Sequence, residues 1–529
     1  MEATAGKLVL KIAYVLAATL LTGCTVVGPD SEAPVAPALP TNWNSVDAAA
    51  QTQQEANWWT LFQDPVLDDL IERGAQQNLS IEAAGLRIVQ ARAALGISDA
   101  LIFPQQQTVS GNLTKVYQNE HSFNSAGIGL DVGWEMDIWG KYARGIEVSE
   151  ANLYASIASY RDVLVTITAE IARNYINYRT AQERTTLSRQ NIAIQQRVVD
   201  MTQVQFDSGN VTELDVQQSR TQLYGTQAAL PGLSIARMQA RNALAVLLGV
   251  LPEDISPLLA LEESETASTI EQRVNLPAAQ YDANSVIPVA PPLNTSVDAA
   301  LVLRRPDLQL AELQTRAQSA RIGQAEAALY PQFFLFGSIG LSETVPTNGS
   351  FSASNAVTAA IGPGFSWNIF QYGRIKNQVR IEDARYQESL TNYNQRVLQA
   401  VQEVSSALLA YRYSVQQSEY NFRGVAASIR AFNISSTQYN NGLVNYQRLL
   451  STVEKMTLRE DAYAITKGNI ANQVVALYKA LGGGWEAYNT LPLVKPETVE
   501  QMRNRSDWGE RLADENLQPD TVGKERHNE

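Results

Sequence analysis

A long stretch of this chain occurs twice, and this internal duplication limits the possible folds more than any other feature of the sequence. Shifted by 233 positions, residues 134–249 align without a gap on residues 367–482. The matches include glycines as well as helix-forming residues: Gly140 with Gly373, Gly209 with Gly442, and Gly249 with Gly482. Chance similarity between two helical segments would not preserve these glycines, so we expect one fold built from two equivalent halves.

Each copy contains an apolar heptad that predicts a very long helix. Seven of eight positions spaced by seven are apolar in the first copy (157 to 206), with Thr185 as the exception. The second copy (390 to 439) repeats the pattern, with Ser418 at the same place. A seven-residue repeat sustained this far favours helices packed as a coiled coil. The first helix should run from about residue 142 to residue 207, a length of about 100 Å.

Both long helices should end at a glycine. Gly209 follows Phe-Asp-Ser and Gly442 follows Tyr-Asn-Asn. Glycine adopts the left-handed conformation that ends a helix without steric cost. A second helix, from Thr212 to Leu248 in the first copy, should then return over about 55 Å. Each copy therefore predicts an antiparallel helical hairpin with one of these glycines at its turn.

The segment before the first long helix has the alternation of a β-strand. From Ser125 to Ile138, apolar side chains alternate with glycine or acidic residues. This alternation is typical of the strands of outer-membrane barrels. A weaker strand precedes it, across a polar loop near residues 118–124. We therefore expect a β-hairpin over about residues 105–138.

The second copy repeats this arrangement over about residues 332–370. Strands at 333–341 and 357–369 bracket a loop at 347–355 that is rich in glycine, serine and asparagine. The alternative is a soluble sandwich with half-buried strands. Four strands in two hairpins about 200 residues apart would make a poor core for such a sandwich.

Four aromatic residues lie where the predicted strands give way to helices: Trp134, Trp139, Trp367 and Tyr372. Aromatic side chains at such positions are typical of a membrane interface. Four strands cannot close a barrel, and a lipid-exposed sheet edge is not tolerated. Two chains would provide eight strands around a filled lumen, whereas three chains would provide twelve around a passage. The strands therefore favour a homotrimer with a twelve-stranded transmembrane barrel.

The N-terminus has the pattern of a lipoprotein signal. Lys7 and Lys11 flank an apolar run that is too short to span a bilayer. Residues 21–24, Leu-Thr-Gly-Cys, resemble the lipobox of bacterial lipoproteins. This resemblance implies cleavage after residue 23 and acylation of Cys24, and the Thr25 that follows favours the outer membrane. A signal peptide that merely contains a cysteine is the alternative.

These features divide the chain into six segments. They are a signal peptide (1–23), a lipid-anchored tether (24–54), a first repeat (55–250), a linker (251–293), a second repeat (294–484) and a polar tail (485–529). The tail is highly charged, so we expect disorder from about Arg503 onward.

The composition disfavours several classes of function. The net charge of −13 and the pI of about 4.9 disfavour a nucleic-acid partner. Two histidines and one cysteine cannot supply a histidine-based metal site or a catalytic triad. The sequence also has no phosphate-binding loop and no nucleophile–base pattern. We therefore expect no enzymatic activity, no cofactor and no metal.

Several motifs together resemble the TolC family of outer-membrane channel proteins, especially its lipid-anchored OprM- or NodT-like branch. They are the lipobox, the Trp-Trp-x-x-Phe-x-Asp-Pro-x-Leu run at 58–67, Arg-Arg-Pro-Asp-Leu at 304–308 and the paired Phe/Tyr-x-x-Gly turns. The resemblance covers roughly residues 55–485. It implies a trimer with a twelve-stranded barrel on a periplasmic helical tunnel, which serves as the exit duct of a tripartite efflux pump. The implied partners are outer-membrane lipid, a periplasmic adaptor protein and an inner-membrane transporter of the RND type.

The same resemblance implies a gate at the periplasmic tip of the tunnel. By position, Tyr439 corresponds to the gate tyrosine of the family and Asp215 to its aspartate partner. The chain departs from the best-known member at Val444, Arg448 and Ser451, where that member has an arginine and two aspartates. Asp215 and Arg448 are equivalent under the shift of 233 and carry opposite charges. We therefore expect them to pair, within or between subunits, with two solvated surface charges as the alternative.

The predicted fold is an α+β membrane protein, with long helical hairpins that form an α-barrel and four strands per chain. The predicted function is a passive outer-membrane exit duct for drugs or other small molecules. Two alternatives stay open. One is a duct for type I protein secretion, and the other is a structural coiled-coil lipoprotein or periplasmic adaptor, which would lack the two membrane-strand hairpins.

Overall fold

The structure is a computed structural model that describes residues 26–37, 56–118, 121–259, 285–293, 299–352 and 356–518. The expected signal peptide, Cys24, most of the tether and much of the linker lie outside the described residues. So does the centre of each β-hairpin loop.

The duplicated helices occur at equivalent positions in the two copies. Helix α5 (Lys141–Asp207) and helix α10 (Arg374–Asn440) each have 67 residues. The returning helices α6 (Glu213–Leu248) and α11 (Tyr446–Leu481) each have 36 residues. All four bounds differ by the offset of 233 found in the sequence, so the predicted long helices and their returning partners are confirmed.

Shorter helices precede the strands in both copies. In the first copy, α3 (Pro65–Gln77) follows Asp64, whose Oδ1 caps it by accepting hydrogen bonds from the amides of Val66 at 3.0 Å and Leu67 at 3.2 Å. Helix α4 (Leu79–Ala100) follows it, and α9 (Pro306–Ala327) takes the same place in the second copy. Short helical turns, namely η1 (Trp58–Phe62), α7 (Ser256–Leu259) and η3 (Ala299–Arg304), complete this part of the chain.

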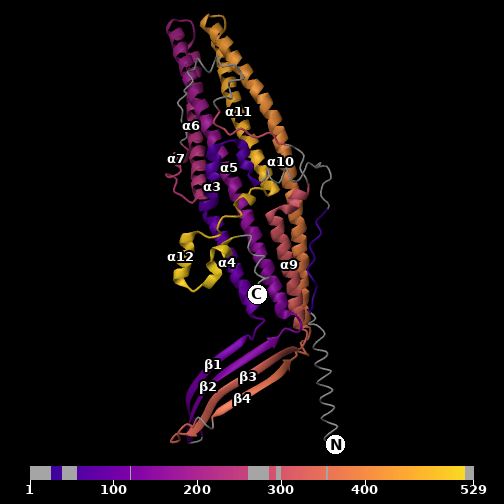
Figure 1. Cartoon of the computed structure of the whole chain (residues 1–529). Coiled ribbons are helices and arrows are strands. Elements are labelled where there is room, and N and C mark those ends of the chain that lie inside the picture. Colours follow the sequence, from indigo (N-terminus) through magenta and orange to yellow (C-terminus); the bar gives the residue numbers. More distant parts are fainter. Residues whose placement is uncertain are drawn as a thin grey trace. The chain divides into compact units, whose positions relative to one another are not determined.

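The strands form one antiparallel sheet in the order β1-β2-β3-β4, as Figure 1 shows. The strands are β1 (Gln106–Gln118), β2 (His121–Met136), β3 (Gln332–Pro346) and β4 (Val357–Ser366). The two predicted hairpins are therefore joined edge to edge through β2 and β3, and not packed as a soluble sandwich.

Three predicted strand limits are wrong. The loop expected at 118–124 is shorter, because β2 already pairs with β1 from His121, opposite Gln118. The first strand of the second copy runs past residue 341 to Pro346, where it pairs with Phe123. The last strand ends at Ser366, so Trp367 and Ile369 lie beyond the pairing that holds β4 to β3. In each case the cross-strand hydrogen bonds, which the alternation of side chains does not reveal, set the limit.

The chain separates into two compact units that cut across the duplication. The first unit contains the sheet and comprises residues 1–36, 87–158 and 308–396. The second unit comprises residues 37–86, 159–307 and 397–529. Each unit therefore combines segments from both copies, because the parts of the two copies pack against each other.

Aromatic stacking organises the core of the second unit. The ring of Trp58 stacks on that of Tyr478 with 5.6 Å between ring centroids, and the ring of Trp59 stacks on that of Tyr488 with 5.8 Å between centroids. Trp58, Leu67, Leu70 and Ile71 are fully or almost fully buried. The motif that opens the folded chain is thus tied to the end of α11 and to the segment that follows it.

The segment after α11 is folded, which contradicts the disorder expected from Arg503. Helix α12 (Pro496–Arg505) is followed by the turns η6 (Gly509–Leu512) and η7 (Asp514–Leu517). The Leu493 amide donates to the Leu517 carbonyl at 2.8 Å, and Arg503 donates to the Leu512 carbonyl at 2.7 Å. A few buried apolar anchors hold this polar segment in place. Residues 519–529 lie outside the described part.

Candidate functional site

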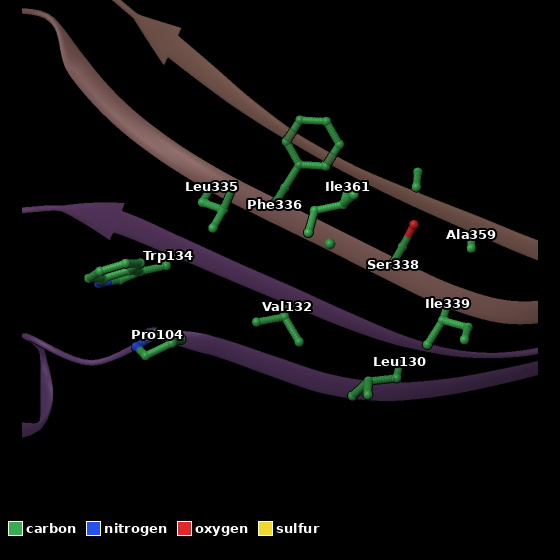
Figure 2. A pocket seen from close by; sticks show the side chains of 12 residues that line it. Pro104, Leu130, Val132, Trp134, Leu335, Phe336, Ser338, Ile339, Ala359 and Ile361 are labelled. Atoms are coloured by element: carbon green, nitrogen blue, oxygen red, sulfur yellow. The ribbon is translucent and has the colours of Figure 1, made fainter. Parts of the chain in front are cut away.

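One face of the sheet is apolar and exposed. Register places Leu130 beside Val109 and Ile339, and Ile339 beside Ala359, so all four side chains point to the same face. Ile361 on the same face is 82% exposed. Figure 2 shows this surface along β2, β3 and β4, with Ile339 on one side of β3 and Phe336 and Ser338 on the other. An apolar surface of this extent is unusual on a protein surrounded by water.

The other face of the sheet is polar or formed by small residues. Thr108, Asp131, Ser338 and Ala360 lie side by side on it. The predicted alternation therefore holds in β2, where glycine and acidic residues occupy this face. A sheet with one apolar and one polar face can separate lipid from water.

Strand β3 departs from this alternation, and its glycine neighbours explain why. Phe334 and Phe336 lie on the polar face, opposite Gly364 and Gly362 of β4. A side chain at Gly364 would come within 2.3 Å of the Phe334 ring. The two glycines therefore leave space for aromatic rings that would otherwise clash with β4.

The predicted aromatic residues lie at one end of the sheet. The indole N–H groups of Trp134, Trp139 and Trp367 donate to the carbonyls of Ile102 at 2.9 Å, Pro331 at 2.7 Å and Leu329 at 3.0 Å. Tyr372 is fully exposed. Three of the four aromatic residues are therefore fixed to the segments that lead into strands, and their role as a membrane belt stays a prediction.

Sequence reasoning missed a cluster that docks the N-terminal segment in the first unit. The buried Arg144 donates to the carbonyls of Val27 and Gly28, each at 3.2 Å, and to Asp30 at 3.0 Å and Glu147 at 2.8 Å. The Val27 amide also donates to the Trp139 carbonyl at 3.1 Å. Residues 26–31, the first described part of the expected tether, are therefore held against the protein.

A glycine contact completes this docking. Gly28 has a φ of +91°, and a side chain on it would come within 2.2 Å of the Gly323 Cα. The backbones of the N-terminal segment and α9 can approach this closely only because both residues are glycine. In the sequence, only Gly28 itself could have indicated this docking, and a single glycine is too common to interpret.

Both helical hairpins turn at the predicted glycines, which lie at the same end of the second unit (Figure 1). Gly209 has a φ of +77° and Gly442 a φ of +68°. The Gly209 amide donates to the Phe206 carbonyl at 2.8 Å, and the Gly442 amide to the Tyr439 carbonyl at 3.0 Å. Both turns therefore end their long helix through a left-handed glycine, as the sequence indicated.

Asp215 stabilises the start of its own helix. One of its carboxylate oxygens, Oδ2, accepts hydrogen bonds from the Thr212 amide at 3.0 Å and the Thr212 hydroxyl at 2.8 Å. This arrangement is a capping box at the first turn of α6. Within the described part of one chain the exposed Arg448 forms no ion pair with Asp215, and the expected pairing within or between subunits stays a prediction. The capping bonds use only the Oδ2 atom of Asp215.

Tyr439 is buried within its own chain. Its ring meets Tyr446 edge to face at 6.1 Å. Both tyrosines belong to an apolar cluster from α5, α10 and α11, which we call the tip cluster. Its buried members are Ile194, Val198, Phe432, Tyr439, Tyr446, Leu449, Leu450, Val453 and Met456.

The surroundings of these two tyrosines favour their neutral form. Burial raises the pKa of Tyr439; the nearby Thr202 hydroxyl opposes this rise, and the negative charge of Asp215 adds to it. Burial also raises the pKa of Tyr446, which Asp215 increases further. The structure thus brings Tyr439 and Asp215 within electrostatic range, without a hydrogen bond between them among the described residues. Tyr446 is the member of this group that sequence reasoning missed.

The described residues bear on the type of site in two ways. They contain no group of three histidine, cysteine, aspartate or glutamate side chains that could hold a metal ion. None of the helices in this part of the chain is long and apolar enough to cross a membrane. The features that remain are the two-faced sheet and the tips of the helical hairpins.

Comparison with protein families and curated proteins gives a consistent picture. The family model described as "Outer membrane efflux protein" matches residues 70–250 and 299–483. Nodulation protein T of Rhizobium leguminosarum bv. trifolii is 28% identical over 88% of this chain and 96% of its own length. The cation efflux system protein CusC of Escherichia coli O6:H1 is 27% identical over 89% of this chain and 97% of its own length. The probable outer membrane lipoprotein SilC of Salmonella typhimurium is 26% identical over 90% and 99%.

Solved structures with the same fold include outer-membrane channels. The channel OprN superposes with a TM-score of 0.71 and 29% identity, over 87% of this chain and 99% of its own. The channel CmeC of Campylobacter jejuni superposes with a TM-score of 0.72, over 90% of this chain and 98% of its own. At 21% identity, the second comparison bears on the fold alone.

Proposed function

The chain belongs to the outer membrane efflux protein family, and from this premise we propose that it is the passive, trimeric exit duct of a tripartite efflux pump. Its relatives are outer-membrane efflux channels, and the chain is the outer-membrane component of such a pump. The proposal adds the homotrimer, the lipid anchor, the periplasmic tunnel with its gate, and the two pump partners. These partners are a periplasmic adaptor and an inner-membrane transporter.

The open, two-faced sheet is the observation that carries the proposal. Strands β1 and β4 each pair with only one other strand among the described residues, so the sheet has two free edges. Free edges beside lipid leave backbone N–H and C=O groups without partners, which costs several kcal/mol per group. Pairing β1 of one subunit with β4 of the next removes both edges. Three subunits would close twelve strands around a passage, with Asp131 and its polar neighbours toward water.

The docked N-terminal segment supports a lipid anchor beside the sheet. Cys24 precedes Val27 by three residues, which at full extension spans about 10 Å. Val27 is bonded to Trp139, just after β2. Acyl chains on Cys24 would therefore enter the membrane near the aromatic end of the sheet.

We propose that Arg448 acts in the gate between subunits. Its exposed side chain lies in the first turn of α11, six residues after Gly442. Asp215 uses Oδ2 for its own helix and leaves Oδ1 for a neighbour. Three Asp215–Arg448 contacts around a three-fold axis would hold the tips together, next to the buried Tyr439.

The cargo does not follow from the relatives. Their names refer to cation efflux, nodulation and, for a Pseudomonas putida protein, pyoverdine export. We propose small molecules as the substrate class, with selection by the inner-membrane transporter.

Planar-bilayer recording of the purified protein tests the duct and the gate together. The protein should migrate as a heat-modifiable trimer on a gel and form channels of uniform conductance. Asp215→Ala combined with Arg448→Ala should raise that conductance, whereas Arg73→Ala, which breaks a surface pair with Asp69, should not. A monomer without channel activity would refute the duct. Normal channels with unchanged conductance in the double variant would refute only the gate.

A further inference from the structure

A layer of polar side chains is buried between α5 and α11 in the second unit. Asn191 and Gln195 come from α5, and Thr457 and Glu460 come from α11. Asn191 and Gln195 are each only 2% exposed. The Asn191 amide donates from Nδ2 to Glu460 Oε2 at 3.0 Å, which fixes the two helices opposite each other at this level.

Helix geometry brings the four side chains together. Gln195 lies four residues after Asn191, so both point from the same face of α5. Thr457 lies three residues before Glu460 and shares its face of α11. The two helices run in opposite directions. Because Asn191 lies opposite Glu460, Gln195 therefore lies at the level of Thr457.

Several polar atoms of this layer have no partner in the protein. Within the described part of the chain, neither Nε2 nor Oε1 of Gln195 makes a hydrogen bond to a protein atom. The same holds for Asn191 Oδ1 and Thr457 Oγ1. Buried side-chain polar atoms in native proteins almost always bond to protein or to ordered water. Four such atoms in one layer therefore indicate a shared ligand.

We propose that this layer is a binding site for ordered water between α5 and α11. A buried water usually makes about three hydrogen bonds to otherwise unpaired polar groups. One molecule can accept a hydrogen bond from Gln195 Nε2 and donate to Asn191 Oδ1 and Thr457 Oγ1. The remaining acceptor, Gln195 Oε1, suits a second water. Amide and hydroxyl groups of neutral charge match water better than they match an ion.

The position of the site gives it a mechanical consequence. Val198, Val453 and Met456 of the tip cluster follow it on the side of the hairpin turns. Close-packed apolar side chains resist sliding, whereas bonds through water can be remade in a new geometry. The water layer therefore lets α5 and α11 shift at the base of the tip cluster. Its presence does not depend on the cargo or on the pump partners.

Hydrogen exchange and a structure that resolves water test the proposal. Gln195→Leu removes two of the polar atoms that bind water in the layer. Backbone amides at residues 188–199 should therefore exchange about tenfold more slowly. Gln195→Met, which keeps the volume, gives the same test if the leucine variant does not fold. Gln196→Leu changes the neighbouring exposed residue and should leave exchange unchanged.

The structural arm of the test uses the wild-type protein. Cryo-electron microscopy at a resolution that shows water should reveal density within hydrogen-bond distance of Gln195 and Asn191. Two results would overturn the proposal. One is a Gln195 amide bonded directly to protein atoms, and the other is exchange at residues 188–199 that is the same in wild type and in both Gln195 variants.

Discussion

Replacing Arg305 should strongly destabilise the second unit. Its Nε and Nη2 atoms donate to the two oxygens of Asp307 at 3.0 and 2.9 Å. Its Nη1 atom donates to Glu403 at 2.8 Å and to the Ala480 carbonyl at 2.7 Å. One side chain thus joins the start of α9, the middle of α10 and the end of α11. Arg305→Met keeps much of the side-chain volume and removes all four bonds.

The size of the effect follows from the burial of each partner. The side chains of Arg305 and Asp307 are 10% and 12% exposed, so the variant leaves Asp307 as a buried charge without its counter-ion. Breaking a buried pair from one side costs about 3–5 kcal/mol. Glu403 is 50% exposed, and water can replace its lost bond at little cost. We therefore expect a loss of about 3–5 kcal/mol in the free energy of unfolding.

Urea unfolding in detergent, followed by the fluorescence of buried tryptophans such as Trp58, measures this loss. The matched control is Arg73→Met, because the side chains of the Arg73–Asp69 pair are 44% and 45% exposed and the pair should contribute little to stability. Adding Asp307→Ala to Arg305→Met should restore part of the stability, because the unpaired charge is then gone. If Arg305→Met costs no more than Arg73→Met, the burial argument is wrong.

Three further predictions concern glycines and a buried acid. Gly85→Ala places a Cβ 1.8 Å from the Leu493 carbonyl oxygen and should lower the free energy of unfolding, measured thermally, by about 1–3 kcal/mol. Gly225→Ala, with open space around it, should raise that free energy by up to about 1 kcal/mol. Equal effects of the two substitutions would contradict the packing. Gly323→Ala, with a Cβ 2.6 Å from the Val27 carbonyl oxygen, should expose residues 26–31 to protease, and Gly145→Ala should not. Burial raises the pKa of Glu486 above 4.5. A raised pKa means that the folded protein favours the protonated carboxyl. The stability that Glu486 contributes is therefore present below pH 4.5 and lost as pH rises. Glu486→Gln should therefore raise the melting temperature at pH 7 and not at pH 4, and a gain that is the same at both values would exclude a titration effect.

The sequence predicted the parts of the fold that depend on local, repeated signals. The heptads and the glycines at 209 and 442 defined both hairpins, because helix length and helix ends depend on neighbouring residues. The alternation in β2 revealed its apolar face. Phe334 and Phe336 broke the same alternation, because their placement depends on glycines in another strand, about 30 residues away.

The site was harder to predict because its residues act through tertiary contacts. Only the ring contact with Tyr439 in the structure identifies Tyr446 as part of the site, although both residues lie near the turn at Gly442. The role of Asp215 had a local signal that the charge argument overlooked. Thr212 stands three residues before Asp215, which is the spacing of a capping box. The folded tail after Arg503 had no such signal, because its few apolar anchors are scattered among charged residues.

The capping role of Asp215 also limits how strong the proposed gate can be. Breaking the hydrogen bonds between Thr212 and Asp215 Oδ2 would remove a helix cap that stabilises α6 by about 0.5–2 kcal/mol. An exposed ion pair returns only about 0.2–1 kcal/mol, so Arg448 must bind the remaining oxygen while the cap stays intact. Three such pairs would hold the closed tips by about 3 kcal/mol at most. A contact of this size keeps the tips together at rest, yet a partner protein that binds the open tips slightly better can release them.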